Sequence, residues 1–159
     1  MKDMTMRYMR SMSMDLNNKN FDEKIEELLN KPYAVIDFLP EQLKEEKGDN
    51  YFKVEQFFLE KKNKEGLYRH FAYFIIKLSS YYDLVINHNE KTISDYEMGD
   101  ICDLFVNSGQ KTCLNILLTE KECLISFIGN DLYLSVYNAD DKLKELMKKL
   151  AMSEGLFLR

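Results

Sequence analysis

Five side chains of this sequence have types and positions that suit ligand chemistry. Asp37 stands inside a short apolar run, where a buried carboxylate costs several kcal/mol unless it finds a partner. His70 lies on an expected helix and heads the candidates for a general base, because imidazole titrates near neutral pH. Tyr81, Tyr82 and Asp83 follow that helix directly. We expect these five side chains to line any ligand pocket between a sheet and its helices.

Two of these residues also have a purely structural interpretation. A cationic partner, a capped turn or the solvent can satisfy Asp37. His70 stands between Arg69 and Phe71, as an ordinary histidine at the boundary of a core does. Both interpretations stay open at the level of the sequence, so we assign no catalytic residue and lean against an enzyme.

A second group of candidates consists of four carboxylates on a helix expected over 93–106. Asp95, Glu97, Asp100 and Asp103 give that helix an acidic face, which suits a basic protein partner. Reversing the charge of Asp95 and Asp100 together is expected to leave stability nearly unchanged. Exposed charges away from special features shift stability by only about ±0.5 kcal/mol.

Several kinds of site are excluded by spacings that the sequence lacks. Neither G-x-G-x-x-G nor G-x-x-x-x-G-K-[ST] occurs, so no phosphate-binding loop is expected. Two histidines and three cysteines show no C-x-x-C, H-x-x-x-H or H-E-x-x-H pattern, which predicts no zinc site and no cofactor. Cys102, Cys113 and Cys123 stand in apolar stretches, so we expect buried, unreactive thiols.

Composition and charge bound the class of protein. The chain has 159 residues, of which 45% are hydrophobic and 31% charged, as in a globular domain. A net charge of −5 without a basic stripe disfavours nucleic acid. No apolar run approaches the ~20 residues that span a bilayer, so no membrane contact is expected. The odd number of cysteines and the lack of a secretory signal predict a cytoplasmic location.

Residues 1–14 are expected to form a Met-rich flexible tail, and 15–159 a single domain. The tail holds six of the nine methionines and almost no other apolar side chain. Two alternatives stay open: the translation start lies as late as Met14, or the Met-x-Met pairs bind Cu(I).

The remaining pattern predicts an α+β fold, in which a mainly antiparallel sheet with a three-stranded meander packs against four to five helices. The apolar periodicity and the turn residues place helices at 20–30, 51–62, 67–79, 93–106 and 140–151. For 71–78 a strand competes with the helix. Strands are expected at 33–39, 81–87, 112–118, 123–128, 132–137 and, at an edge, 156–158.

Two functions from different classes fit these observations. The first is a non-catalytic protein-binding domain, immunity-like or regulatory, that meets a basic partner through its acidic surface. Small acidic immunity proteins, which neutralise a toxin encoded beside them, are similar in charge and size alone. The second is a small-molecule sensor or small enzyme with a pocket between sheet and helices. A deep pocket where the first five candidates converge favours the second, and a closed core with an acidic face favours the first.

Overall fold

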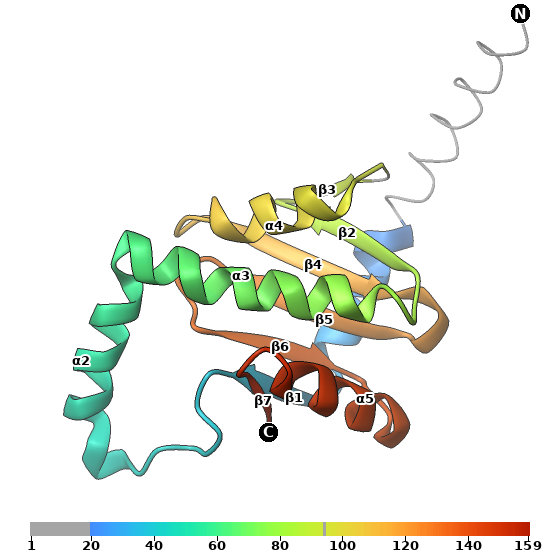
Figure 1. Cartoon of the computed structure of the whole chain (residues 1–159). Coiled ribbons are helices and arrows are strands. Elements are labelled where there is room, and N and C mark those ends of the chain that lie inside the picture. The colour runs from blue at the N-terminus through green and yellow to red at the C-terminus, as the bar shows by residue number, and fades with distance from the viewer. Residues whose placement is uncertain (1–19, 94) are drawn as a thin grey trace, which may run out of the picture.

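A seven-stranded sheet organises the chain in the computed structural model, which describes residues 20–93 and 95–159 (Figure 1). The strand order is β3-β2-β4-β5-β6-β1-β7, and every neighbouring pair is antiparallel. The strands span Tyr33–Asp37 (β1), Leu84–His88 (β2), Lys91–Ile93 (β3), Cys113–Leu118 (β4), Cys123–Ile128 (β5), Tyr133–Tyr137 (β6) and Phe157–Leu158 (β7).

Three helices cover one face of this sheet, which we call the closed face (Figure 1). α3 (Lys61–Leu78) crosses its middle, while α4 (Met98–Val106) and α5 (Asp141–Met152) lie on either side. α3 buries one stripe at helical spacing because its apolar residues recur every three or four positions. That stripe consists of Leu67, Tyr68, Phe71, Ala72, Phe74, Ile75 and Leu78.

The opposite face, which we call the open face, carries one short helix over 20–29. Its apolar residues Phe21, Ile25 and Leu28 recur about one turn apart and pack on Leu117 and Leu124. Strand alternation separates the two faces, since Leu124 belongs to this cluster while the next residue along β5 belongs to the core beneath α3.

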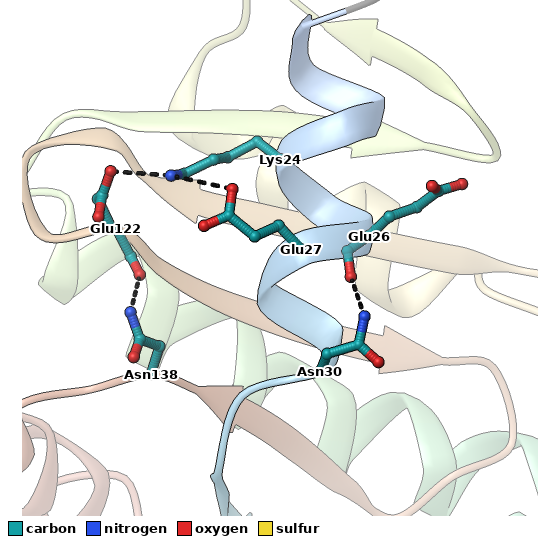
Figure 2. Close-up of polar contacts among 6 residues, drawn as sticks. All are labelled: Lys24, Glu26, Glu27, Asn30, Glu122 and Asn138. Atoms are coloured by element: carbon teal, nitrogen blue, oxygen red, sulfur yellow. Dashed lines mark hydrogen bonds and ion pairs between the residues drawn. The ribbon is translucent and has the colours of Figure 1, made fainter.

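Polar contacts fix the same short helix to the loop between β4 and β5 (Figure 2). Lys24 Nζ donates to Glu122 Oε1 at 2.8 Å and lies 3.6 Å from Glu27 Oε2. The hydrogen bond between Lys24 and Glu122 raises the pKa of Lys24 and lowers that of Glu122. Asn138 Nδ2 donates to the carbonyl of Glu122 at 2.9 Å, so one residue ties the helix to the end of β6.

The α+β prediction with a mainly antiparallel sheet is confirmed. The strands predicted at 112–118, 123–128 and 132–137 appear as β4, β5 and β6, which pair in chain order. The competition between helix and strand over 71–78 is decided for the helix, because α3 is continuous there. Among the described residues no helix is long and apolar enough to cross a membrane.

Two helix boundaries differ from the prediction. α2 (Gly48–Leu59) ends before the predicted 62, because Glu60 is extended, and α3 begins at once with Lys61. The predicted helix over 93–106 is wrong at its start. Residues 91–93 form β3, which pairs with β2 through a tight turn, and α4 begins only at Met98. Asn89 and Glu90 both adopt positive φ there, the conformation of a two-residue hairpin turn.

One close approach requires glycine. A Cβ on Gly129 would meet the carbonyl oxygen of Gly109 at 1.7 Å, so no side chain fits without moving the backbone. The Gly129 amide donates to the carbonyl of Thr112 at 2.8 Å. The Gly109 amide donates to the hydroxyl of Thr112 at 2.9 Å. These contacts join the turn after β5 to the loop that enters β4.

The tail and the start residue predicted for positions 1–14 lie outside the described residues.

Candidate functional site

A hollow between α4 and the β2–β3 hairpin has the clearest chemical character. Its volume is about 350 Å³, and we call it the α4 hollow. α4 turns Ile101 and Phe105 into the core, which leaves positions 100, 103, 104 and 107 on one outer side. The hairpin supplies the facing wall. The hollow is lined by His88, Ile93, Asp100, Asp103, Leu104, Asn107 and Ser108.

The lining is divided into an acidic part and an apolar part. Asp100 and Asp103 bring two carboxylates, one turn apart on α4, while Ile93 and Leu104 bring aliphatic side chains. No Lys or Arg of the described residues lies within 4.0 Å of either carboxylate. A site of this kind suits an amphipathic cation, because a Lys or Arg side chain covers apolar surface with its stem and keeps its charged head polar.

The four carboxylates predicted for partner binding do not share one role. Glu97 and Asp100 form a capping box at the start of α4, in which the Glu97 amide donates to Asp100 Oδ2 at 2.8 Å. Asp100 and Asp103 line the α4 hollow, whereas Asp95 is exposed before the helix. Asp100 is therefore more than a free surface charge, which changes the expectation for its reversal. Losing a cap is one of the recognised causes of lost stability.

The segment 81–109, which supplies the whole lining of the α4 hollow, is strongly acidic. Of the charged side chains between 81 and 109, one is basic, Lys91, and six are acidic. The acidic ones are Asp83, Glu90, Asp95, Glu97, Asp100 and Asp103. Like charges gathered around one concave surface add their fields, so a cation is attracted to the hollow from a distance.

The five predicted ligand residues do not converge. Asp37 lies on the open face, since it alternates along β1 with Ile36 of the closed-face core. Tyr82 packs against that core on the other side of the sheet, and Lys121 Nζ lies 5.8 Å from its ring. Tyr81 and Asp83, the residues before and after Tyr82 in the chain, are exposed.

His70, on α3, pairs through Nδ1 with Glu154 Oε2 at 3.0 Å. Lys77 Nζ lies 2.5 Å from the other oxygen of that carboxylate. Burial raises the pKa of Glu154, but the hydrogen bonds from Lys77 and His70, together with the charges of these two side chains, outweigh it and leave the pKa lowered. His70 thus contributes to a tie between α3 and the C-terminal end of α5.

Asp37 has found a structural partner at the β7 edge. Its Oδ2 lies 2.5 Å from Arg159 Nη2, and its Oδ1 accepts the Leu39 amide at 3.1 Å. The side chain is 10% exposed, so this pairing avoids the cost of an isolated buried charge.

Sequence reasoning missed the tyrosines that surround this pair. A second hollow of about 370 Å³ on the open face, the tyrosine hollow, is lined by Tyr33, Val35, Asp37, Tyr133, Ser135, Tyr137 and Arg159. Tyr33 and Tyr137 are cross-strand partners with ring centroids 5.6 Å apart. Burial, followed by the charge of Asp131, raises the pKa of Tyr133. The sequence does show tyrosines at 33, 133 and 137. Only the pairing of β1 with β6 reveals that they lie on the same face of the sheet.

Metal and nucleophile chemistry find little support in the described residues. No group of three His, Cys, Asp or Glu side chains among them is placed to hold a metal ion. Cys123 is buried, and burial raises its pKa to about 12. Cys113 and Cys102 are half-buried, so the expectation of complete burial is wrong for these two. Burial also raises the pKa of Cys113.

Comparison of the chain with protein-family models, curated proteins and solved structures gave no match.

Proposed function

We propose that this chain is a non-catalytic protein-binding domain, immunity-like or regulatory, whose α4 hollow receives a lysine or arginine side chain of a basic protein partner. The observation that carries the proposal is the pair Asp100 and Asp103, two carboxylates with no Lys or Arg of the described residues within 4.0 Å, beside an aliphatic wall. A partner's cation would bring the missing charge, and its stem would cover Ile93 and Leu104.

The closed core supports the same choice between the two functions. Side chains between the sheet and α3 are tightly buried, with Phe71, Phe74 and Leu78 fully inaccessible. The residues expected to line a pocket there are dispersed over both faces of the sheet. The α4 hollow, in contrast, is a concave and charged region at the surface, where a protein partner can reach it.

A small-molecule sensor is the second candidate, and the tyrosine hollow favours it. Three phenol rings, a serine hydroxyl and one guanidinium surround about 370 Å³ on the open face. Rings give flat apolar contact and the polar groups give orientation, as in ligand sites generally. Asp37 and Arg159 already satisfy each other, however, so the hollow offers less unpaired charge than the α4 hollow does.

A direct test uses a single blocked amino acid as the probe. Nα-acetyl-lysine-methylamide is titrated into the ¹⁵N-labelled full chain, and the norleucine analogue serves as the uncharged control. We expect lysine-dependent shifts at the amides of Ile93, Leu104 and Asn107, weakened by Asp103→Asn. Asp95→Asn removes the same charge outside the hollow and is expected to change little.

Two results would overturn the proposal. Equal shifts from norleucine and lysine would show that the carboxylates do not select a cation. Shifts confined to Tyr33, Tyr133 and Tyr137 would move the binding site to the tyrosine hollow and put the sensor first. Once a partner is known, Asp103→Lys should slow its association most at low salt. At physiological ionic strength, exposed charges more than about 8 Å apart are largely screened from one another.

A further inference from the structure

α2 is a helix that exposes its apolar side chains instead of burying them. None of its twelve residues is buried, although it contains Phe52, Val54 and Phe57. These three side chains are 60%, 40% and 54% exposed. Figure 1 shows α2 extending away from the sheet, beyond the layer formed by α3, α4 and α5. We call residues 39–59, which comprise α2 and the loop before it, the arm.

The arm is held to the body mainly at one end. The ring of Phe58 contacts the tilted ring of Phe38 after β1, with ring centroids 4.8 Å apart, and Asn63 Nδ2 donates to the carbonyl of Phe57 at 2.9 Å. Toward its start, α2 faces the body across another hollow of about 290 Å³, which Gly48 and Tyr51 share with Asp37 and Arg159. Val54 and Phe57 on one side of α2 lie beside Leu43 of the loop, which is 45% exposed, and a joined apolar surface of this kind marks an interaction site.

The arm carries a projecting side chain, Phe57, and a recess on the same side. The recess has a volume of about 230 Å³ and is lined by Leu39, Leu43, Lys47, Asn50, Tyr51 and Val54. Phe57 follows Val54 by three residues, which places it on the same side of the helix one turn further on. A surface that contains both a projection and a matching recess is self-complementary under a twofold axis.

Charge points to the same occupant. Acidic and basic side chains are interspersed along the arm, five acidic and three basic, unlike the almost wholly acidic segment 81–109 that lines the α4 hollow. A second copy turned by a twofold axis can place Lys44, Lys47 and Lys53 opposite acidic groups of the first. The mixed charges of the arm are Glu41, Lys44, Glu45, Glu46, Lys47, Asp49, Lys53 and Glu55.

We propose that the arm is a homodimer interface, in which two α2 helices pack antiparallel and Phe57 of each copy enters the recess of the other. This inference goes beyond the proposed function and does not depend on the α4 hollow. Phe52 lies about 140° around the helix from Phe57, given the 100° between successive residues, and therefore stays outside the contact. It provides a matched control of the same residue type on the same helix.

The test is sedimentation velocity of the full chain between about 1 and 100 μM. The wild type is expected to sediment as a dimer of twice 18.9 kDa at the upper end. Phe57→Ser is expected to raise the dissociation constant at least about tenfold, and Phe52→Ser less than about twofold. At about 1 μM, where the dimer contributes least, circular dichroism and the thermal midpoint should be unchanged in both variants, since both side chains are mainly exposed.

A cross-linking experiment gives an independent readout. Val54→Cys, next to the twofold axis, is expected to form an intermolecular disulfide under mild oxidation, while the wild type with its native thiols is not. A wild type that stays monomeric at 100 μM would overturn the proposal. A dimer that is insensitive to Phe57→Ser, or that Phe52→Ser weakens as much, would show that the copies meet elsewhere.

Discussion

The two faces of the sheet are built from the same strands but differ in how completely they are covered. On the closed face three helices bury a continuous apolar core, with Phe127 in ring contact with Tyr68, Phe71 and Phe105. On the open face one short helix covers Leu117 and Leu124. Within residues 20–93 and 95–159, the difference indicates that stability resides mainly on the closed face, whereas the open face carries the tyrosine hollow.

The open face also holds a continuous line of polar side chains across the middle of the sheet, where the closed face is apolar. Thr92, Asn87, Asn115, Ser126 and Ser135 are cross-strand neighbours in a line across five strands, which we call the polar row. Within it the Asn87 Nδ2, Thr92 Oγ1 and Asn115 Oδ1 atoms are buried without a hydrogen-bond partner in the described residues. Such atoms are destabilising, since each leaves a desolvated polar group unsatisfied.

The largest expected difference between the faces concerns two thiols. Cys123 belongs to the closed-face core and has a pKa raised by burial to about 12, whereas Cys113 lies half-buried on the open face. A thiol reagent should therefore modify Cys113 at least about a thousandfold faster, because Cys123 reacts only when the domain opens. Mass spectrometry of timed samples measures both rates, and comparable rates would show that the core opens readily.

Two adjacent, equally buried residues of β5 allow the contribution of each face to the free energy of unfolding to be compared. Ile125 faces the closed core and Leu124 the short helix, and both are 0% exposed. Ile125→Ala is expected to cost about 4 kcal/mol and Leu124→Ala about 2, because a site under one short helix collapses more easily. Urea unfolding measures both free energies. A larger loss at Leu124 would reverse the assignment of stability.

The third prediction concerns a double variant in which the polar row loses its two buried amide side chains. Asn87→Leu and Asn115→Leu together should raise the free energy of unfolding by about 1 kcal/mol, since two buried amides are replaced by apolar groups of similar shape. Urea unfolding of the double variant is the measurement. A loss greater than about 1 kcal/mol would show that these amides do have partners.

The smallest effect concerns the tie between α3 and α5. The lowered pKa of Glu154 means that its ion pairs stabilise the fold above the ordinary glutamate pKa of about 4.3 and weaken as the pH falls below it. Glu154→Gln should therefore cost about 0.5–1 kcal/mol at pH 7, in line with partly exposed pairs, and less at pH 3.5. Thermal midpoints at both pH values measure this, and an equal loss at both would exclude the ion pairs as its cause.

Much of the fold follows from local patterns in the sequence. Strands β4, β5 and β6 are short apolar runs between polar turns, and α5 has a capping Asp140 ahead of Leu143, Met147 and Ala151. The helix type of α3 was predicted because Phe71, Phe74, Ile75 and Leu78 recur at helical spacing. The hairpin of β2 and β3 was missed because its turn, Asn89-Glu90, lacks the glycine that usually marks positive φ.

The candidate sites were less predictable because they depend on contacts between distant segments. Asp37 was expected to need a partner, but only the pairing of β1 with β7 brings Arg159 beside it. Asp100 and Asp103 were identified as acidic, yet the apolar wall that accompanies them comes partly from Ile93 on a strand that the sequence analysis placed in a helix. The recess in the arm likewise needs the loop before α2 to fold back on the helix.

The position of β1 determines when the sheet can be completed. This strand is synthesised early, but its two neighbours, β6 and β7, follow only about a hundred residues later. At roughly 5–20 residues per second, a nascent β1 waits for several seconds or longer with both edges unpaired. Val35 and Ile36 are then exposed to any other extended chain. Because such non-local pairing is slow to form, we expect the docking of β1 to be a late step of folding and the stage most prone to aggregation.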